Sequence, residues 1–475
     1  MKASRPIGIF DRQYRTMTIG IMLVLTTSAF EGLAITTIAA KIAQEMQGIH
    51  LYGWIFSAFL LSQLVGTLVM GQQVDQRGIF NSILVSITVF VLGTVTAAAS
   101  VNMYMLIGGR VFQGFGAGAL ITCVYTCVTL YYPDSLRTQI LAAFSMAFVL
   151  PSLIGPYAAG LIASYQSWRF VFWMVIPLIA LALLLTYQSF RDLQRNQQVT
   201  EGRRAVDSKI GKAILLSIGT GMLLTGLGMM TKWEGIALAI GGLGIMIPLM
   251  QQLLPRGTFQ VKSGLPAALV TRGLYVACYF ATESFVILGL TEIKGMAAAI
   301  AGLLVAAGSL SWSGAAWLQA RLDAKDRGTG RKQRVMLGIG IMIGGVILVM
   351  LALFLPGTGI TLILISQIII GFGVGLANPT TAVIALQYAE SGHEGKMSAN
   401  LQFVDSFYVA LSIGVSGALV ALAETMGWGI STGILMVLTL QLLLVVFSFL
   451  SSLRISVLIR EEYQAAGQQI DTLPM

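Results

Sequence analysis

Four ionisable side chains lie inside long apolar stretches, where a charge is costly and therefore chemically informative. Glu31 lies in TTSAFEGLAITT, Arg110 in LIGGRVFQGFGAG and Asp405 in NLQFVDSFYVAL. The fourth, Glu283, lies in YFATESFVIL. Because burial favours the neutral form of a carboxyl group, acids in such places can exchange protons near physiological pH. We therefore interpret Glu31, Glu283 and Asp405 as candidates for proton coupling.

The same residues also permit a structural interpretation. An arginine at the centre of a membrane helix costs about 3 kcal/mol on insertion scales, so it persists beside water or an acidic partner. The acids would then form ion pairs or polar contacts with Arg110, Gln113, Asn400 or Gln402. The sequence alone leaves both interpretations open.

The composition indicates that lipid is the solvent for most of the chain. Of the 475 residues, 56% are hydrophobic and 10% are charged, whereas about a quarter of the residues of a soluble protein are charged. The three cysteines and two histidines offer neither a disulfide framework nor a metal-site spacing. The phosphate-binding pattern G-x-x-x-x-G-K-[ST] does not occur. We therefore expect no metal and no cofactor, with a proton gradient as the energy source.

Fourteen apolar segments are long enough to cross a bilayer, since a spanning helix needs about 20 residues. We therefore predict an all-α polytopic membrane protein. The predicted segments are 17–42, 51–74, 80–100, 103–131, 137–165, 168–188, 211–231, 235–254, 265–290, 295–320, 333–355, 360–388, 396–424 and 428–452.

The basic residues predict the orientation of these segments. With the N-terminus in the cytoplasm, 24 of the 29 lysines and arginines, Arg272 among them, fall on the inner side and four on the outer side. This bias follows the positive-inside rule and explains the net charge of +9 without a nucleic-acid partner. We expect a multi-pass protein in the plasma membrane of a bacterium, with both termini in the cytoplasm.

A glycine pattern occurs twice in the chain. GFGAG at 114–118 returns as GFGVG at 371–375, and at the same spacing Gly160 matches Gly417. The spacing is longer than six helices by about two helices and a loop, which predicts two matching six-helix halves with an insertion between them. Such repeats are typical of transporters that bind their substrate between the halves.

This repeat gives the predicted domain organisation. We expect two six-helix bundles in pseudo-symmetric arrangement and two inserted central helices. The predicted parts are an N-terminal bundle at 17–188, a cytoplasmic linker with the two extra helices at 189–264, a C-terminal bundle at 265–452 and a cytoplasmic tail at 453–475.

The span 17–452 resembles the major facilitator superfamily, specifically its 14-helix drug:proton antiporter branch. LIGGRVFQGFGAG matches the segment-4 motif of that family, with Arg110, Gln113 and Gly114 in the expected places. The resemblance implies a role for this arginine in proton transfer. SWRFVFWMVIP, at 167–177, is similar to the opening of segment 6 in this branch.

A third stretch that carries the resemblance is PSLIGPYAAG at 151–160. It matches the segment-5 antiporter motif at Gly155, Pro156 and Gly160, and Pro151 replaces the first glycine of the motif. Proline bends a helix and small residues permit close helix packing. The family associates this motif with exporters rather than symporters.

The fourth stretch, GQQVDQRG at 71–78, resembles the loop motif that follows segment 2 in this family. Gly71, Asp75 and Gly78 match it. The usual arginine after the aspartate is replaced by Gln76, and Arg77 stands one place later. The resemblance implies that this loop latches the two halves together, with a weaker latch here.

The resemblance implies a proton-coupled multidrug exporter that works by alternating access; the alternative is an exporter of one endogenous lipid or metabolite. A lipophilic cation would suit a cavity that contains carboxylates and aromatic rings. The residues expected to line that cavity are polar or aromatic side chains of the membrane segments. They are Gln113, Phe144, Phe148, Tyr157, Tyr279, Gln402 and Phe403.

We do not expect an enzyme, because the separate acids and scarce histidines form no catalytic dyad or metal set. A sensor or scaffold would carry larger soluble loops than this chain has. The expected partners are a small-molecule substrate, protons and the lipid bilayer, and we expect a monomer that binds no nucleic acid.

Overall fold

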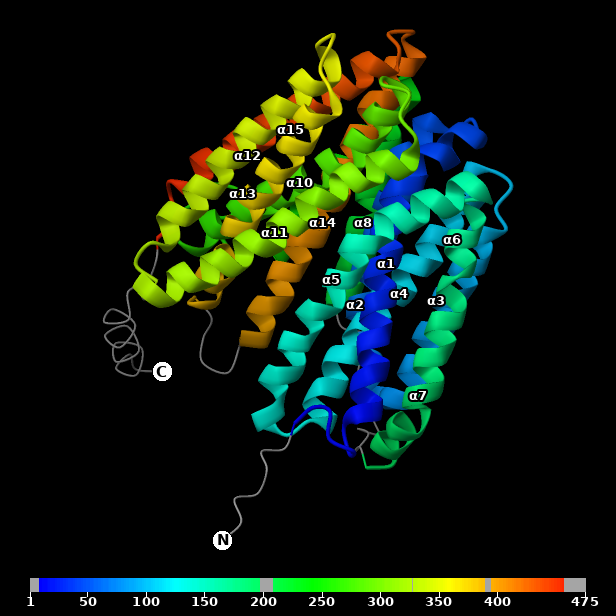
Figure 1. Ribbon diagram of the computed structural model, residues 1–475, viewed down its shortest axis with the longest axis vertical. Coiled ribbons are helices and arrows are strands. Elements are labelled where there is room, and N and C mark those ends of the chain that lie inside the picture. The colour runs from blue at the N-terminus through cyan, green and yellow to red at the C-terminus, as the bar shows by residue number, and fades with distance from the viewer. Residues whose placement is uncertain (1–7, 197–207, 327, 389–393, 457–475) are drawn as a thin grey trace. The chain divides into compact units, whose positions relative to one another are not determined.

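The computed structural model describes residues 8–196, 208–326, 328–388 and 394–456. Within these ranges the chain forms fifteen α-helices and one short 3-10 helix, without strands (Figure 1). The helices are α1 (Arg15–Glu45), η1 (Ile49–Leu51), α2 (Tyr52–Arg77), α3 (Ile79–Ala98), α4 (Met103–Tyr131), α5 (Asp134–Tyr165), α6 (Arg169–Trp173), α7 (Val175–Asn196), α8 (Ser208–Gly228), α9 (Trp233–Leu253), α10 (Leu265–Glu292), α11 (Ala298–Asp326), α12 (Arg331–Phe354), α13 (Ile360–Leu386), α14 (Glu394–Thr425) and α15 (Ile430–Ser452).

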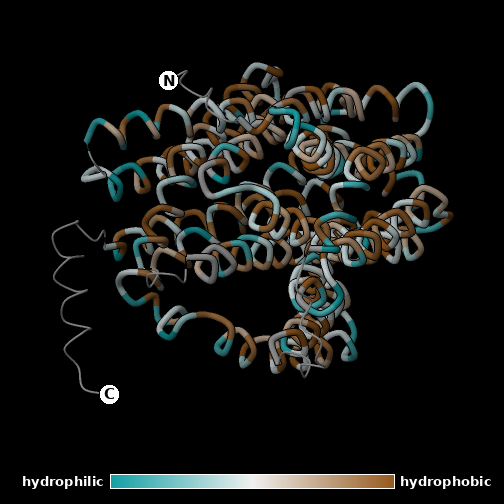
Figure 2. The backbone as a smooth tube through the Cα atoms, turned by 90° about the horizontal axis from the view of Figure 1, so that it is seen from below, coloured by the Kyte–Doolittle hydropathy of each residue, from teal (hydrophilic) through white to brown (hydrophobic). Residues whose placement is uncertain are grey.

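The prediction of an all-α polytopic membrane protein is confirmed. Among the residues that the structure describes, thirteen helical segments are long and apolar enough to cross a membrane. Each of them coincides with a predicted segment. The remaining predicted segment, 137–165, is occupied by α5, which is not among the thirteen. Figure 2 shows hydrophobic residues along most of the helices.

The predicted segment 168–188 is two helices rather than one. α6 ends at Trp173, and α7 begins at Val175 after a single intervening residue. Pro177 explains the break, because its nitrogen has no hydrogen to donate to the carbonyl of Trp173 and its ring crowds that carbonyl. The two helices still form one candidate span, Arg169–Arg195.

Local sequence signals determine several helix ends. Gly78 separates α2 from α3 with a φ of 79°, a left-handed conformation that glycine adopts without strain. Asn102 precedes α4, and its side chain accepts a hydrogen bond of 2.9 Å from the backbone N–H of Met105. This bond satisfies one of the free donors at the start of the helix.

The chain folds into two compact units. Unit 1 comprises Met1–Leu249, Glu283–Ala306 and Ile413–Ile434. Unit 2 comprises Met250–Thr282, Ala307–Ser412 and Leu435–Met475. Neither unit is continuous in sequence, and the predicted division at 17–188, 189–264 and 265–452 stays a prediction.

Glycines allow α4 to approach both of its neighbours in unit 1. A Cβ atom at Gly114 would lie 2.1 Å from the carbonyl oxygen of Phe59 in α2. One at Gly116 would lie 2.5 Å from the backbone nitrogen of Phe90 in α3. Helices in lipid associate through such close packing, because lipid chains are as apolar as the side chains themselves. α4 therefore packs closely against both α2 and α3.

The repeated glycines of α13 produce the same packing in unit 2. A Cβ atom at Gly371 would lie 2.0 Å from the carbonyl oxygen of Gly308 in α11. One at Gly373 would lie 2.4 Å from the carbonyl oxygen of Gly338 in α12. α12 and α13 lie side by side in Figure 1. In both units, the repeated glycines thus allow one helix to pack closely against two neighbours.

Candidate functional site

Arg110 and Glu31 form a buried ion pair in unit 1. Arg110, in α4, is 1% exposed, and Glu31, in α1, is 4% exposed. Nη1 of Arg110 donates a hydrogen bond to Oε1 of Glu31 and another, of 2.7 Å, to Oε1 of Gln113. Its Nε donates to the carbonyl oxygen of Ile55 at 3.0 Å, and the guanidinium lies 4.1 Å from the ring centroid of Phe59. Three helices, α1, α2 and α4, therefore hold this one charged group.

The network of the pair continues into α3. Nε2 of Gln113 donates a hydrogen bond of 3.2 Å to Oγ1 of Thr94, and that hydroxyl donates to the carbonyl oxygen of Phe90 at 2.8 Å. Gln113 is fully buried. A chain of polar groups thus joins α1, α2, α3 and α4. The two charges of the ion pair at its centre cancel when Glu31 is ionised.

A second ion pair, which sequence reasoning missed, lies in unit 2 between buried Arg272 and half-buried Asp405. Arg272 of α10 donates two hydrogen bonds to Asp405 of α14, from Nε to Oδ1 at 2.8 Å and from Nη2 to Oδ2 at 2.7 Å. Its Nη1 donates to the carbonyl oxygen of Asn378 at 2.9 Å and to Oγ1 of Thr381 at 3.3 Å. The hydroxyl of Tyr275 lies 2.5 Å from that Oγ1 atom. Two-pronged pairs of this kind are among the stronger charged hydrogen bonds.

Sequence reasoning counted Arg272 only among the basic residues of the inner side. Arg272 stands well inside α10 and is 8% exposed. The signal was present in the sequence, because Arg272 falls inside the predicted segment 265–290 just as Arg110 falls inside 103–131. Its partner was not predictable, since the pairing of α10 with α14 is a tertiary contact.

The four proton-coupling candidates fall into three places. Glu31 and Arg110 share one site, and Asp405 is paired separately with Arg272. Glu283 belongs to unit 1, in the second part of α10, and is 3% exposed. The structure thus pairs Glu31 with Arg110 in unit 1 and Asp405 with Arg272 in unit 2.

The residues expected to line a substrate cavity have different surroundings. Tyr279 is 1% exposed and contacts the ring of Trp312 edge to face, with centroids 5.1 Å apart. Tyr157 is 43% exposed. Phe144 is buried in the apolar core of unit 1. Gln402 is exposed, beside Phe403, whose ring stacks on Phe407. The side chain of Phe148 lies outside the described part of the structure.

The segment-5 motif combines bends with close packing. Pro151 and Pro156 both lie within α5. A Cβ atom at Gly155 would make ordinary contacts, the nearest 3.5 Å from the ring of Phe30. One at Gly160 would lie 2.4 Å from the Cα atom of Ala299, the second residue of α11. Only a residue without a side chain permits this approach within unit 1.

The motif at 71–78 was expected to be a loop, but residues 71–77 form the end of α2, and α7 contacts the turn that follows. Gly78 provides the turn, and Gln194 of α7 accepts a hydrogen bond from the backbone N–H of Phe80 at 2.9 Å. The same side chain donates to the carbonyl oxygen of Arg77, also at 2.9 Å. Gly71 is half-buried and Arg77 is exposed, and the side chain of Asp75 lies outside the described residues.

A cluster of ion pairs joins the end of α11 to the start of α12. Arg331 donates two hydrogen bonds to Asp323, at 2.8 and 2.6 Å. Arg334 pairs with Asp323 at 2.7 Å and also with Asp326. Sequence reasoning did not predict these pairs. The aspartates and arginines of RLDAKDRGTGRKQR, residues 321–334, were the available signal.

Metal binding receives no support from the described residues, since no group of three or more His, Cys, Asp or Glu side chains there could hold an ion. Cys123, Cys127 and Cys278 are buried free thiols.

The chain is similar in sequence and fold to known membrane transporters. It is 25% identical over 254 residues to the MFS-type transporter pydD of Acremonium sp, a match that covers 54% of this chain and 44% of that protein. It is 23% identical over 363 residues to the multidrug efflux pump SdrM of Staphylococcus aureus (strain N315), a match that covers 75% of each protein.

Among solved structures, the fold is similar to that of a POT family transporter in complex with 5-aminolevulinic acid. The TM-score is 0.67 at 16% identity, and the match covers 92% of this chain and 96% of that one. A family model described as Major Facilitator Superfamily matches residues 19–413. The chain is thus a multi-pass membrane protein that belongs to the Major Facilitator Superfamily of transporters.

Proposed function

We propose that this chain exports lipophilic small molecules, cations among them, in exchange for protons by alternating access. The name of its relative SdrM, a multidrug efflux pump, supports the efflux of drugs. The observation that carries the coupling part of the proposal is the buried Glu31–Arg110 pair. In this proposal the protein is a monomeric carrier without enzymatic activity, and a proton gradient rather than a cofactor supplies the energy.

Charge compensation is the reason why this pair suits coupling. When Glu31 is ionised, its charge cancels that of Arg110, and breaking such a buried pair is costly. When a proton neutralises Glu31, the charge of Arg110 is left with neutral acceptors, Oε1 of Gln113 and the carbonyl oxygen of Ile55. The proton therefore destabilises this arrangement and favours another one. We infer that α1 and α4 shift relative to each other in each transport cycle.

Competition between substrate and proton completes the cycle. A cationic group close to ionised Glu31 disfavours protonation of that carboxylate, so substrate loading expels the proton. A proton arriving from the outer side then returns Glu31 to its protonated form. The Asp405–Arg272 pair has the same chemistry and acts in the same way in unit 2.

We place both termini in the cytoplasm, an orientation that the distribution of lysine and arginine supports. In this orientation the Arg331–Asp323 cluster lies on the cytoplasmic side. The plasma membrane of a bacterium is the compartment that we propose.

Flux measurements on the purified protein in lipid vesicles test this function. The probes are ethidium as a lipophilic cation, an uncharged dye of similar size and a fluorescent phospholipid. We expect ethidium to move against its gradient only while a pH gradient is present, and a protonophore to abolish the movement. Ethidium flux equal to that of empty vesicles, with transport of the phospholipid alone, would favour export of an endogenous lipid instead.

A further inference from the structure

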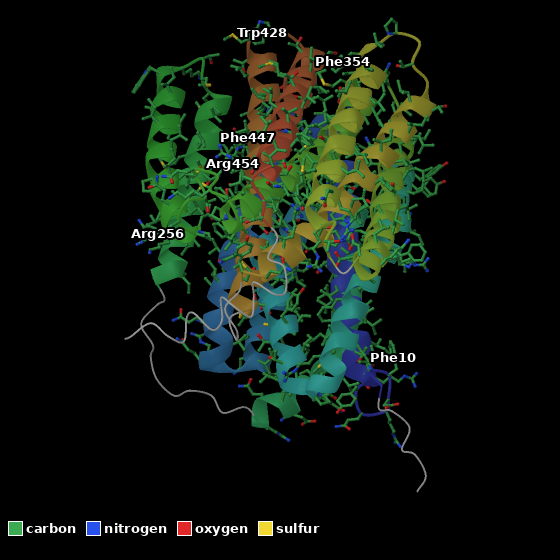
Figure 3. The ribbon with its side chains drawn as sticks, turned by 90° about the vertical axis from the view of Figure 1, so that its left-hand side faces the viewer. Phe10, Arg256, Phe354, Trp428, Phe447 and Arg454 are labelled. Atoms are coloured by element: carbon green, nitrogen blue, oxygen red, sulfur yellow. The ribbon has the colours of Figure 1, made fainter. Side chains whose placement is uncertain are left out.

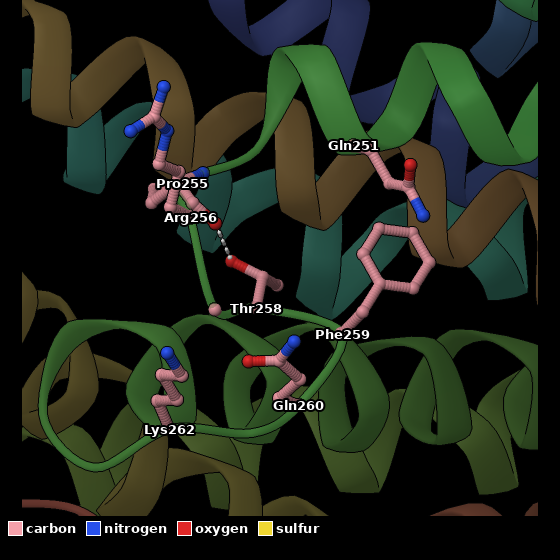
Figure 4. Close-up of a pocket in the computed structure, with 8 residues that line it drawn as sticks. Gln251, Pro255, Arg256, Thr258, Phe259, Gln260 and Lys262 are labelled. Atoms are coloured by element: carbon pink, nitrogen blue, oxygen red, sulfur yellow. Dashed lines mark hydrogen bonds between the residues drawn. The ribbon is translucent and has the colours of Figure 1, made fainter.

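The loop between α9 and α10 forms a pocket at the membrane surface. α9 and α10 are both long and apolar enough to span the membrane, so residues 254–264, which join them, lie where lipid headgroups meet water. The pocket has a volume of about 320 Å³ and is lined by residues between Gln251 and Lys262 (Figure 4). All of these residues belong to unit 2.

The charge of this pocket is uncompensated. Arg256 and Lys262 both line it, and no acidic residue does. Both side chains are exposed, and among the described residues neither takes part in an ion pair. Arg331 and Arg334, in contrast, have aspartate partners. The pocket therefore presents two positive charges that no carboxylate of the described chain neutralises.

A third arginine fixes the shape of the loop from the end of α15. Nη1 of Arg454 donates hydrogen bonds to the carbonyl oxygens of Gln260 and Val261, at 3.4 and 3.3 Å. The carbonyl oxygen of Arg454 in turn accepts from the backbone N–H of Gly264 at 3.2 Å. Figure 3 labels Arg454 at the end of α15 and Arg256 beyond the end of α9. The loop is thus held in one form by contacts remote in sequence.

The backbone of the loop is strained at one position. Val261 has a φ of 48°, a left-handed conformation that β-branched residues rarely adopt. The N–H of Lys262 donates to the carbonyl oxygen of Gly257 at 3.1 Å, which closes the turn around that position. Strain of this kind persists where surrounding contacts enforce it, and it is frequent at binding sites.

We propose that this pocket binds a phosphate group, that of an anionic phospholipid of the surrounding leaflet. In Figure 4 the ammonium group of Lys262 and the amide of Gln260 point into the curve of the loop, whereas the guanidinium of Arg256 points away from them. Lys262 and Gln260 supply donors for phosphate oxygens, and Arg256 adds positive charge at the edge of the pocket. Phe259 is 51% exposed beside Gln251 and offers an apolar surface to the glycerol and acyl part of a lipid. Basic pockets between membrane helices on the cytoplasmic side are known to take such headgroups.

Native mass spectrometry of the detergent-solubilised full chain tests the site. The protein is titrated with phosphatidylglycerol, with phosphatidylcholine of the same acyl chains and, separately, with inorganic phosphate. We expect phosphatidylglycerol to bind about tenfold more tightly than phosphatidylcholine. Contacts with one to two basic side chains would provide a difference in affinity of this size. The double variant Arg256→Gln/Lys262→Gln should lose this preference, whereas Arg256→Lys/Lys262→Arg should keep it.

Arg195→Gln is the matched control, because Arg195 is an exposed basic residue at the end of α7 and the charge change per residue is the same. It should bind phosphatidylglycerol as the unaltered chain does. If the chain binds inorganic phosphate but neither lipid, and the double variant loses that binding, the pocket is a phosphate site but lipid is not its ligand. Equal binding of both lipids, or a preference that survives in the double variant, would overturn the proposal.

Discussion

At the scale of single residues, the Glu31–Arg110 pair makes a testable statement about stability. Removing one member of a buried ion pair leaves the other charge uncompensated, which costs about 3–5 kcal/mol. We expect Glu31→Gln and Arg110→Gln each to lower the unfolding free energy by an amount of that order, and the double variant to lose less than the sum. Unfolding of the four proteins in detergent measures this coupling. Strictly additive losses would contradict a direct interaction.

The Arg272–Asp405 pair is tested through transport. Arg272→Gln removes the charge and both hydrogen bonds to Asp405, and we expect pH-driven flux to fall about tenfold or more. Arg272→Lys keeps the charge without the two-pronged geometry, so it should retain an intermediate rate. Arg195→Gln, an exposed arginine, is the control and should transport normally. Unchanged flux in Arg272→Gln would assign the pair a purely structural role.

At the scale of helices, two glycines of α4 predict opposite effects on stability when each is replaced by alanine. A methyl group at Gly114 would collide with backbone of α2, whereas one at Gly108 meets nothing within 4 Å. Gly114→Ala should therefore destabilise the protein by about 1–3 kcal/mol through overpacking. Gly108→Ala should be neutral or stabilising, because alanine is more favourable than glycine inside a helix by about 1 kcal/mol. The thermal unfolding midpoints of the two variants test this prediction. Equal midpoints would be evidence against close packing at Gly114.

The helices were predictable from sequence because hydropathy and length act locally. The glycine repeat matched α4 with α13, and the glycines of both helices lie where a Cβ atom would collide with neighbouring backbone. The break at Pro177 was a local signal that the prediction of a single segment overlooked. The Arg272–Asp405 pair and the loop held by Arg454 depend on helices remote in sequence, which periodicity alone cannot bring together.

At the scale of the whole molecule, alternating access requires packed helix ends to separate. Within unit 1, a Cβ atom at Gly417 of α14 would lie 2.6 Å from the Cα atom of Gly53 in α2. Beside it, the hydroxyl of Tyr52 donates to the carbonyl oxygen of Ser284 at 2.6 Å. In the proposed mechanism this contact belongs to one state of the cycle and has to open in another.

Gly417→Leu should therefore shift the population away from this state. Ser284 is 1% exposed, so a Ser284→Cys reporter should react slowly with a membrane-impermeant thiol reagent. We expect labelling about tenfold faster when Gly417→Leu is added, as a shift of about 1.4 kcal/mol would produce. Gly244→Leu, at a position with nothing within 4 Å, is the control and should leave the rate unchanged. Slow labelling in both variants would show that this contact does not gate the molecule.

The central claim is that substrate and proton exclude each other at buried arginine–carboxylate pairs. Its most direct test is proton release by the purified protein in weakly buffered detergent, followed with a pH indicator while ethidium is added. We predict that the unaltered chain releases protons on binding, and that Glu31→Gln/Asp405→Asn, which mimics the protonated carboxyls, binds ethidium more weakly and releases none. Ethidium binding with no proton release from the unaltered chain, at any pH where it transports, would contradict the account.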